Sequence, residues 1–217
     1  GVDAVVHLAG ESIDGRWTND KKNRIHQSRA LGTSLLAETL ANLENPPEVF
    51  VSTSAVGAYG NHPTDIATED TPMANDFLGN VCQVWESSAS MVQSRDIRLV
   101  HPRFGVVLSG RGGALKKMLP PFLAGAGGKV GSGSQWMPWI ALDDVVGILF
   151  DMIMSPKWSG PVNVVAPNPV QNAEFTKVLG RVLSRPTVFP VPAFAIRTMF
   201  GEMGQTLVLE GRHVQSN

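Results

Sequence analysis

Four short apolar runs, separated by segments with helical spacing, constrain the fold of this 217-residue chain more than any other feature. The runs are rich in β-branched residues and nearly continuous, as expected of strands buried on both faces of a sheet. They are AVVHLA (4–9), VFVSTSA (49–55), IRLVHP (97–102) and PVNVVA (161–166). Because such strands alternate with helices, the sequence predicts an α/β fold with a doubly wound parallel sheet.

Apolar residues at helical spacing predict four helices among these strands. A first helix is expected over 25–40, and a second begins at Asp76, its predicted N-cap. A third should follow residues 112–113, although the prolines at 120–121 should kink or split it. The fourth should follow residues 143–144.

Prolines become frequent after residue 156 and punctuate two further helical stretches. Composition shifts of this kind often mark domain boundaries. We therefore expect residues 1–156 to form the sheet domain and residues 157–217 to form part of a smaller C-terminal α/β lobe.

The composition argues against several classes of partner. A formal net charge of -1 gives no general attraction to nucleic acid or to anionic membrane. No apolar run reaches the roughly 18 residues of a membrane span, and no secretory leader opens the chain. The lone Cys82 has no disulfide partner, and the five histidines lack the spacing of a zinc site. We expect a cytoplasmic protein without a bound metal whose partner is a small molecule; the oligomeric state stays open.

Small residues follow the first predicted strand in the segment HLAGES (7–12). In a doubly wound sheet, ligands bind outside the carboxyl ends of the strands. There, Leu8, Ala9, Gly10 and Glu11 would let a flat cofactor approach the backbone. The alternative interpretation is an ordinary exit from strand to loop.

Three hydroxyl groups end the second predicted strand, and a tyrosine follows it, in VSTSAVGAYG (51–60). At the carboxyl end of a strand, Ser52 and Thr53 could hydrogen-bond a nicotinamide amide, and Ser54 or Tyr59 could exchange a proton with a substrate. Alternatively, the hydroxyls cap the following turn. The functional interpretation is favoured because the first strand ends in a similar way.

Three other features have both a functional and a structural interpretation. Arg24 and Arg29 on the first predicted helix are either solvated or in contact with a phosphate, which arginine can clamp with two nitrogens. Asp143 and Asp144 are expected to cap a helix rather than to act as a catalytic pair. Cys82 lies among apolar residues at helical spacing and is expected to be buried rather than nucleophilic.

Glycines are dense between residues 125 and 133, but they do not follow a strand as a dinucleotide-binding loop should. We interpret 125–139, which ends in Trp136 and Trp139, as a mobile loop that closes over a ligand. The alternative is that both tryptophans are fixed core residues.

In this order, the motifs resemble the extended short-chain dehydrogenase/reductase superfamily, and most closely its atypical epimerase-like group (SulA-type or nucleoside-diphosphate-sugar epimerase proteins). The resemblance covers nearly the whole chain. It implies a Rossmann-like domain that binds NADP(H) more readily than NAD(H), and a small C-terminal lobe that closes over a substrate such as a nucleotide sugar. The segments that carry it are HLAGES (7–12), RW (16–17), IHQSRALGT (25–33), GRGGALKKMLPPF (110–122), GSGSQWMPWIALDDV (131–145) and APNPVQNAEF (166–175).

Carried over position by position, the resemblance implies roles for several residues. Residues 8–11 would line the adenosine and ribose side of the cofactor, and Arg29 takes the place of an active-site asparagine. Gly105 and Val106 would supply the backbone that meets the nicotinamide carboxamide, with Arg103 just before them. The glycine fingerprint for the pyrophosphate is absent from this chain, so we expect it in an amino-terminal strand-helix-strand of a longer protein.

The same alignment puts Leu78 and Cys82 where the superfamily carries its catalytic tyrosine and lysine. Leucine has no proton to give, and a thiol is not a permanent cation. The candidate proton donors are therefore Tyr59, Ser54, which matches the hydroxyl of the catalytic triad, or a group on the substrate. The sequence predicts an NADP(H)-binding oxidoreductase or epimerase-like enzyme with a non-standard active site. The alternative is a catalytically weak or inactive sensor or regulatory protein that keeps the cofactor site.

Overall fold

The computed structural model describes residues 1–62 and 64–217 and is built around a parallel sheet. Residues 103 and 104 pair with β3 on one side and with β9 on the other, so β5 is the central strand. The edge strand β1 pairs with β2. The five strands are β1 (Ala4–His7), β2 (Val49–Ser52), β3 (Ser54–Ala55), β5 (Arg98–Phe104) and β9 (Gly160–Val164). All four predicted strands are confirmed.

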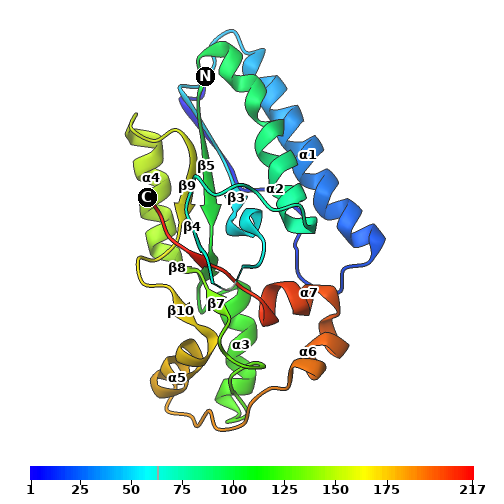
Figure 1. Cartoon of the computed structure of the whole chain (residues 1–217). Helices are drawn as coiled ribbons and strands as arrows, with labels where there is room; N and C mark the ends of the chain where they lie inside the picture. The colour runs from blue at the N-terminus through cyan, green and yellow to red at the C-terminus, as the bar shows by residue number, and fades with distance from the viewer. Residues whose placement is uncertain (63) are drawn as a thin grey trace.

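Helices cover both faces of this sheet (Figure 1). α1 (Asn19–Ala41) and α2 (Phe77–Ser88) lie on one face, and α4 (Leu142–Met154) lies on the other. The predicted α/β fold, a Rossmann-like doubly wound parallel sheet, is confirmed.

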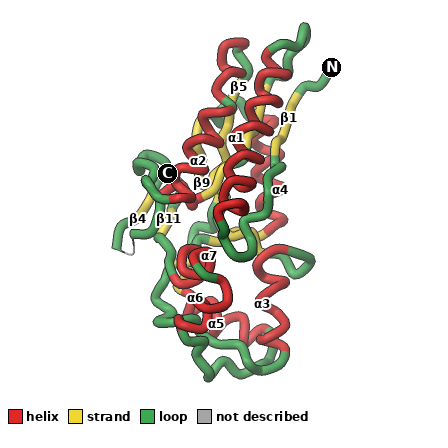
Figure 2. The backbone as a smooth tube through the Cα atoms, turned by 90° about the vertical axis from the view of Figure 1, so that its right-hand side faces the viewer, coloured by secondary structure: helices red, strands yellow, loops and turns green. Residues whose placement is uncertain are grey.

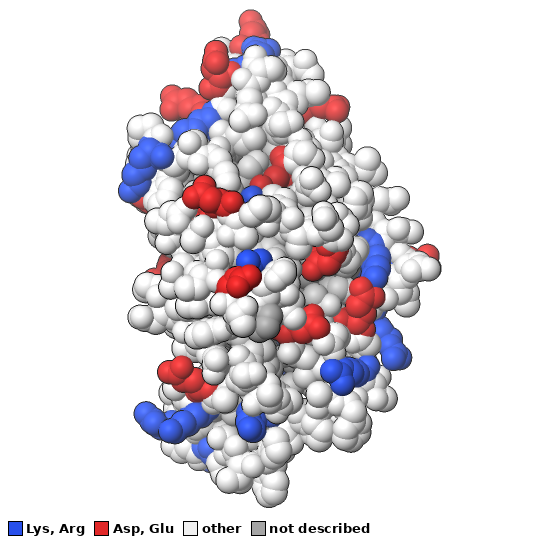
Figure 3. Space-filling model, in the orientation of Figure 1, with Lys and Arg blue, Asp and Glu red and all other residues white. Residues whose placement is uncertain are grey.

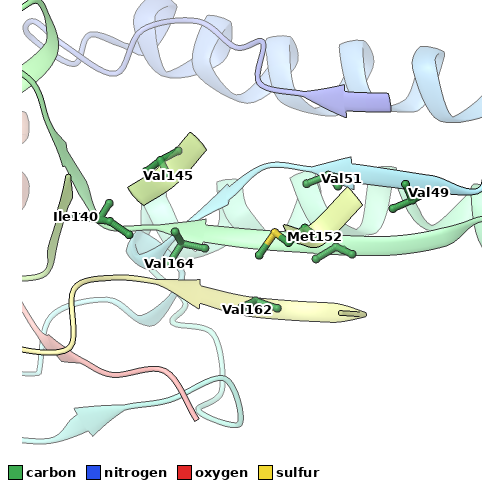
Figure 4. Close-up of a cluster of buried hydrophobic side chains, with 8 residues drawn as sticks. Val49, Val51, Ile140, Val145, Met152, Val162 and Val164 are labelled. Carbon is green, nitrogen blue, oxygen red and sulfur yellow. The ribbon is translucent and has the colours of Figure 1, made fainter. Parts of the chain in front are cut away.

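The core explains why the strands lack an alternating pattern. Along β2, Phe50 packs with residues of α1, whereas Val49 and Val51 pack toward α4 on the opposite face. Because side chains alternate between the two faces of a strand, burial on both faces requires a continuous apolar run. Figure 4 shows the cluster on the α4 side, where Val145 and Met152 meet the sheet.

The helix boundaries confirm one cap and correct two predictions. Asp76 is the N-cap of α2, and its carboxylate accepts a hydrogen bond of 2.8 Å from the amide of Gly79. Asp143 and Asp144 are not N-caps: they lie in the first turn of α4, where negative charge favours the helix dipole. The prolines at 120–121 do not split α3 (Gly113–Leu123), which runs through both.

Smaller elements gather below the carboxyl end of the sheet (Figures 1 and 2). Short ladders join chain segments that are far apart in sequence, such as β4 (Ile66–Ala67) with β11 (His213–Val214). The other two ladders are β6 (Val106–Leu108) with β8 (Trp139–Ala141), and β7 (Trp136–Met137) with β10 (Val170–Gln171). The remaining helical segments are η1 (Val56–Tyr59), η2 (Ser90–Arg95), α5 (Asn172–Val182), α6 (Ala193–Phe200), α7 (Glu202–Gly204) and the π-helix η3 (Gln205–Leu209).

β9 belongs to the central sheet although it lies after the boundary expected at residue 156. The division into two domains at that residue stays a prediction. Within the described part of the chain, no helix combines the length and the apolar character that crossing a membrane requires. Acidic and basic side chains are interspersed on the face shown in Figure 3, in keeping with the net charge of -1.

Candidate functional site

The carboxyl end of β1 exposes a large apolar side chain beside small residues. Leu8 is 57% exposed although it directly follows a strand of the central sheet, and Ala9 and Gly10 are exposed as well. An apolar surface with little side-chain bulk, at the carboxyl edge of a parallel sheet, suits a flat ring such as adenine. The residues present therefore fit the adenosine end of a dinucleotide.

Arg29 lies directly beneath this surface. Its guanidinium carbon would be 3.3 Å from a Cβ atom at Gly10, so the glycine makes room for the arginine. Arg29 donates a 3.0 Å hydrogen bond from Nη1 to the carbonyl of Glu11 and packs 4.6 Å from the ring centroid of Trp85. Burial lowers the pKa of Arg29. Guanidinium nevertheless stays charged in proteins, so this loop has a fixed positive charge beneath it.

Glu11 closes the same loop. Its carboxylate accepts a 2.7 Å hydrogen bond from Lys21 and lies 3.6 Å from Arg24. The hydrogen bond and charge of Lys21, together with Arg24, lower the pKa of Glu11, which keeps the carboxylate ionised. The structure thus brings together residues 8–11, Arg24 and Arg29.

The hydroxyls of Ser52, Thr53 and Ser54, at the carboxyl end of β2 and in β3, are buried. Ser52 is fully buried, and its hydroxyl has no hydrogen-bond partner among the described residues. Thr53 donates a 2.8 Å hydrogen bond to the carbonyl of His7, the residue before Leu8. Ser54 donates a 2.6 Å hydrogen bond to the carboxylate of Glu86. Each hydroxyl therefore lies within the fold at the carboxyl end of the sheet.

Tyr59 and Arg103 form the centre of a buried polar network. The hydroxyl of Tyr59, which is 0% exposed, donates a hydrogen bond of 2.6 Å to Asn163 and accepts one of 2.8 Å from Arg103. Arg103 also forms a bidentate pair of 2.8 and 3.0 Å with Glu86, which accepts from Ser54. Burial raises the pKa of Tyr59, so its hydroxyl stays protonated. The network leaves the Tyr59 hydroxyl no free position toward a substrate.

Sequence reasoning missed two members of this network. Asn163 was hidden inside the apolar run PVNVVA, where a lone amide was itself a signal because buried polar groups need partners. Glu86 was not predicted as a site residue. Its helix, α2, brings it below the carboxyl end of β5.

Cys82 is buried, as expected. It is 3% exposed, and its Sγ lies 3.7 Å from the carbonyl of Ala55. Burial, with the negative charge of Glu86, raises the pKa of the Cys82 thiol to about 11. A thiol that stays protonated and shielded from solvent is a poor nucleophile.

A cavity of about 130 Å³ opens at the carboxyl end of the sheet, and Leu78 and Val106 lie in its wall. Gly105 adjoins it, and a Cβ atom there would be 2.6 Å from the carbonyl oxygen of Pro138, so only glycine allows this close approach. The polar side chains of the wall come from the loops after η1 and from the C-terminal segment: Asn61, Asp76, Thr206, Glu210 and Arg212. None of these five was predicted as a site residue.

The segment 125–139 is anchored at several points. Trp136 lies in β7 and stacks on His213 with ring centroids 4.4 Å apart. The side chain of Asn172 accepts a 2.8 Å hydrogen bond from the amide of Val130. The side chain of Gln135 donates a 2.9 Å hydrogen bond to the carbonyl of Val208. These anchors favour fixed tryptophans over a mobile lid, although Trp136 also lines the cavity.

A comparison with known protein families identifies the family of this chain. The model of the NAD dependent epimerase/dehydratase family matches residues 1–165. A chloroplastic SDR39U1 homolog of the epimerase family from Arabidopsis thaliana is 44% identical over 216 residues, which cover 99% of this chain. The chain spans 62% of the length of that relative.

Two solved structures extend the similarity. Human epimerase family protein SDR39U1 (isoform 2), crystallised with NADPH, is 36% identical with a TM-score of 0.95, and the match covers 99% of this chain and 74% of the human one. The nucleoside-diphosphate sugar epimerase from Corynebacterium glutamicum is 37% identical with a TM-score of 0.72, over 96% of this chain and 47% of the other.

Proposed function

The chain belongs to the NAD dependent epimerase/dehydratase family, and from this premise we propose that it is the greater part of an NADP(H)-dependent oxidoreductase or epimerase-like enzyme. The exposed side chain of Leu8 at the carboxyl end of β1 is the observation that carries the proposal. At the carboxyl edge of the sheet, an apolar side chain among small residues offers a flat contact surface to an adenine ring. The preference for NADP(H) rests on the human relative, which was crystallised with NADPH.

Separate groups of residues would hold the two ends of the cofactor. Residues 8–10 would contact the adenosine, and Arg24 and Arg29 would contribute positive charge near its phosphates. Gly105 and Val106, beside the cavity, would meet the nicotinamide carboxamide. When bound, the nicotinamide accepts or gives a hydride at the cavity. Thr53 has a positioning role, since it holds the carbonyl of His7 just before Leu8.

We propose a polar small molecule, such as a nucleotide sugar, as the substrate. The polar wall of the cavity supports this proposal, and so does the similarity to an enzyme named as a nucleoside-diphosphate sugar epimerase. A catalytically weak cofactor sensor is the second candidate. It is favoured by the aliphatic Leu78 in the cavity wall and by the engagement of the Tyr59 hydroxyl in the buried network. A cytoplasmic location stays a prediction.

Calorimetric titration of the full-length protein with NADPH and NADH tests the cofactor proposal. We expect tighter binding of NADPH, and at least a tenfold loss of affinity in Leu8→Asp because a carboxylate would replace the apolar contact. Leu123→Asp is the matched control, since Leu123 is also an exposed leucine, 51% accessible, but lies in α3. The proposal fails if neither nucleotide binds at millimolar concentration.

A further inference from the structure

The cavity is lined by charged side chains whose roles the family assignment does not explain. Of the described residues that line it, Asp76, Glu210 and Arg212 carry charge. Asp76 comes from the start of α2, whereas the other two come from the C-terminal segment, so the cavity lies between distant parts of the chain. Any substrate that enters it meets both signs of charge.

Arg212 is buried without a counter-charge. It is 9% exposed, and none of the carboxylates in the described part of the chain lies within salt-bridge distance of it. Its Nη1 donates a 2.6 Å hydrogen bond to the carbonyl of Tyr59, while its Nε is buried without an acceptor. A buried cation with unused donors is costly unless a negative charge is supplied from elsewhere. Because Arg212 lines the cavity, an anionic ligand bound there would meet this unpaired charge.

Asp76 is held in place but keeps one oxygen for a ligand. Its Oδ1 accepts the N-capping hydrogen bond from Gly79, which fixes the carboxylate at the start of α2. Its Oδ2 lies on the side of Gly60, 3.1 Å from the position of a Cβ atom there. Gly60 has a φ of 64°, a conformation that favours glycine, and a Cβ atom there would lie 2.6 Å from the Cβ of Ala74.

Other titratable groups near the sheet end are less suited to exchange a proton. The hydroxyls of Tyr59 and Ser54 are engaged in the buried network, and the thiol of Cys82 is shielded. Glu210 also lines the cavity with one oxygen bound, by the side chain of Gln205, which in turn accepts from Arg197. Unlike Asp76, its carboxylate is not fixed by a backbone amide of the described residues. Arginine itself does not give up a proton in this pH range.

We propose that Asp76 exchanges the substrate proton in this cavity and that Arg212 stabilises negative charge on the reacting oxygen. In the oxidative direction, the substrate O–H bond breaks and its proton passes to Oδ2 of Asp76. The C–H bond on the same carbon breaks as its hydride leaves to the oxidised nicotinamide nucleotide, and a C=O bond forms. Reduction reverses each step. This inference rests on the proposed function and assigns its proton transfer to a residue of this chain.

Steady-state kinetics of the full-length protein tests the inference, with NADPH as reductant and phenanthrenequinone as a carbonyl probe. Asp76→Asn keeps the N-cap, because asparagine caps helices as well as aspartate does. We expect it to lower kcat about 10²- to 10⁴-fold, the usual contribution of an acid-base group. KM and NADPH affinity should change less than about threefold. Glu38→Gln, a change of an exposed acid to an amide in α1 and outside the cavity, should retain the wild-type kcat.

A spectroscopic readout tests Arg212 without turnover. The Nε–H signal of Arg212 in an arginine-selective ¹⁵N spectrum, assigned by its loss in Arg212→Lys, should shift when UDP-glucose is added to the NADPH complex. An unchanged signal with bound UDP-glucose contradicts the role of Arg212. A kcat of Asp76→Asn equal to that of Glu38→Gln, or no quinone reduction by the wild type, overturns the role of Asp76. Absence of NADPH binding to the wild type instead overturns the proposed function.

Discussion

Polar side chains at the carboxyl end of the sheet divide into two groups at the scale of single residues. Ser54, Tyr59, Glu86, Arg103 and Asn163 satisfy one another below the surface. The second group lines the cavity and keeps donors and acceptors unused, as at Arg212. The first group can fix the geometry of the sheet end, and the second can contact a ligand.

Tyr59→Phe separates the two groups. Removing the hydroxyl leaves Asn163 and Arg103 without a buried partner, so we expect a loss of about 1–3 kcal/mol in the free energy of unfolding. Because the hydroxyl does not face the cavity, kcat with phenanthrenequinone should change less than about threefold. Urea denaturation and kinetics on the same preparation measure both. A 10²-fold or larger fall in kcat, with the fold intact, would restore Tyr59 as the proton donor.

Cys82→Ala tests the thiol in α2. The thiol is buried and its pKa is raised to about 11, so it is neutral and inaccessible at physiological pH. We expect unchanged kcat and a loss of about 1 kcal/mol or less of stability from the removal of one buried sulfur atom. Melting temperature must be measured alongside the rate. A large fall in kcat with an unchanged melting temperature contradicts the structural role of Cys82.

At the scale of elements, glycines in two helices have opposite roles. At Gly147 in α4 an added Cβ atom has nothing within 4 Å, whereas at Gly79 in α2 it would lie 2.1 Å from the carbonyl oxygen of Ala74. Gly147→Ala should therefore stabilise the protein by about 1 kcal/mol through helix propensity. Gly79→Ala should destabilise it, because a backbone oxygen cannot easily move aside. Chemical denaturation of both variants compares them, and destabilisation by Gly147→Ala is the contrary result.

The segment 125–139 provides a second prediction at this scale. The amides of Val130, Gly131 and Gly133 are bonded to Asn172, Val191 and Val130, which anchors the turn without a ligand. Hydrogen exchange at these amides should be slow in the free protein and nearly unchanged by NADPH. Asn172→Ala should speed exchange at Val130 in particular. Rapid exchange in the wild type that slows on ligand binding would instead support a closing lid.

Local sequence patterns predicted the elements well because each pattern has a local cause. Runs such as VFVS are continuous since the strand is buried on both faces, and Asp76 caps α2 with its own side chain. Predictions from local sequence were wrong for helix boundaries that depend on three-dimensional geometry. Asp143 and Asp144 lie inside the first turn of α4 instead of before it, and α3 continues through Pro120 and Pro121.

At the scale of the whole molecule, the cavity exists because the C-terminal segment returns to the sheet. β11 pairs with β4, more than 140 residues earlier in the chain. The side chain of Asn163 donates a 2.7 Å hydrogen bond to the carbonyl of Gln215. This return carries Glu210 and Arg212 to the loop of Asp76. The sequence could not predict these side chains as a site, because nothing local links the segment GRH to the start of α2. Residues 8–11 were predictable because they directly follow a strand.

The central claim is that one sheet edge holds the cofactor beside the cavity where a substrate reacts. A crystal structure of the full-length protein with NADPH tests it most directly. We expect the adenosine to pack against Leu8 and the carboxamide to contact the backbone of Gly105 and Val106. The reactive face of the nicotinamide should be turned toward Asp76 and Arg212. A complex in which Leu8 stays exposed and the nicotinamide lies outside this cavity would contradict it.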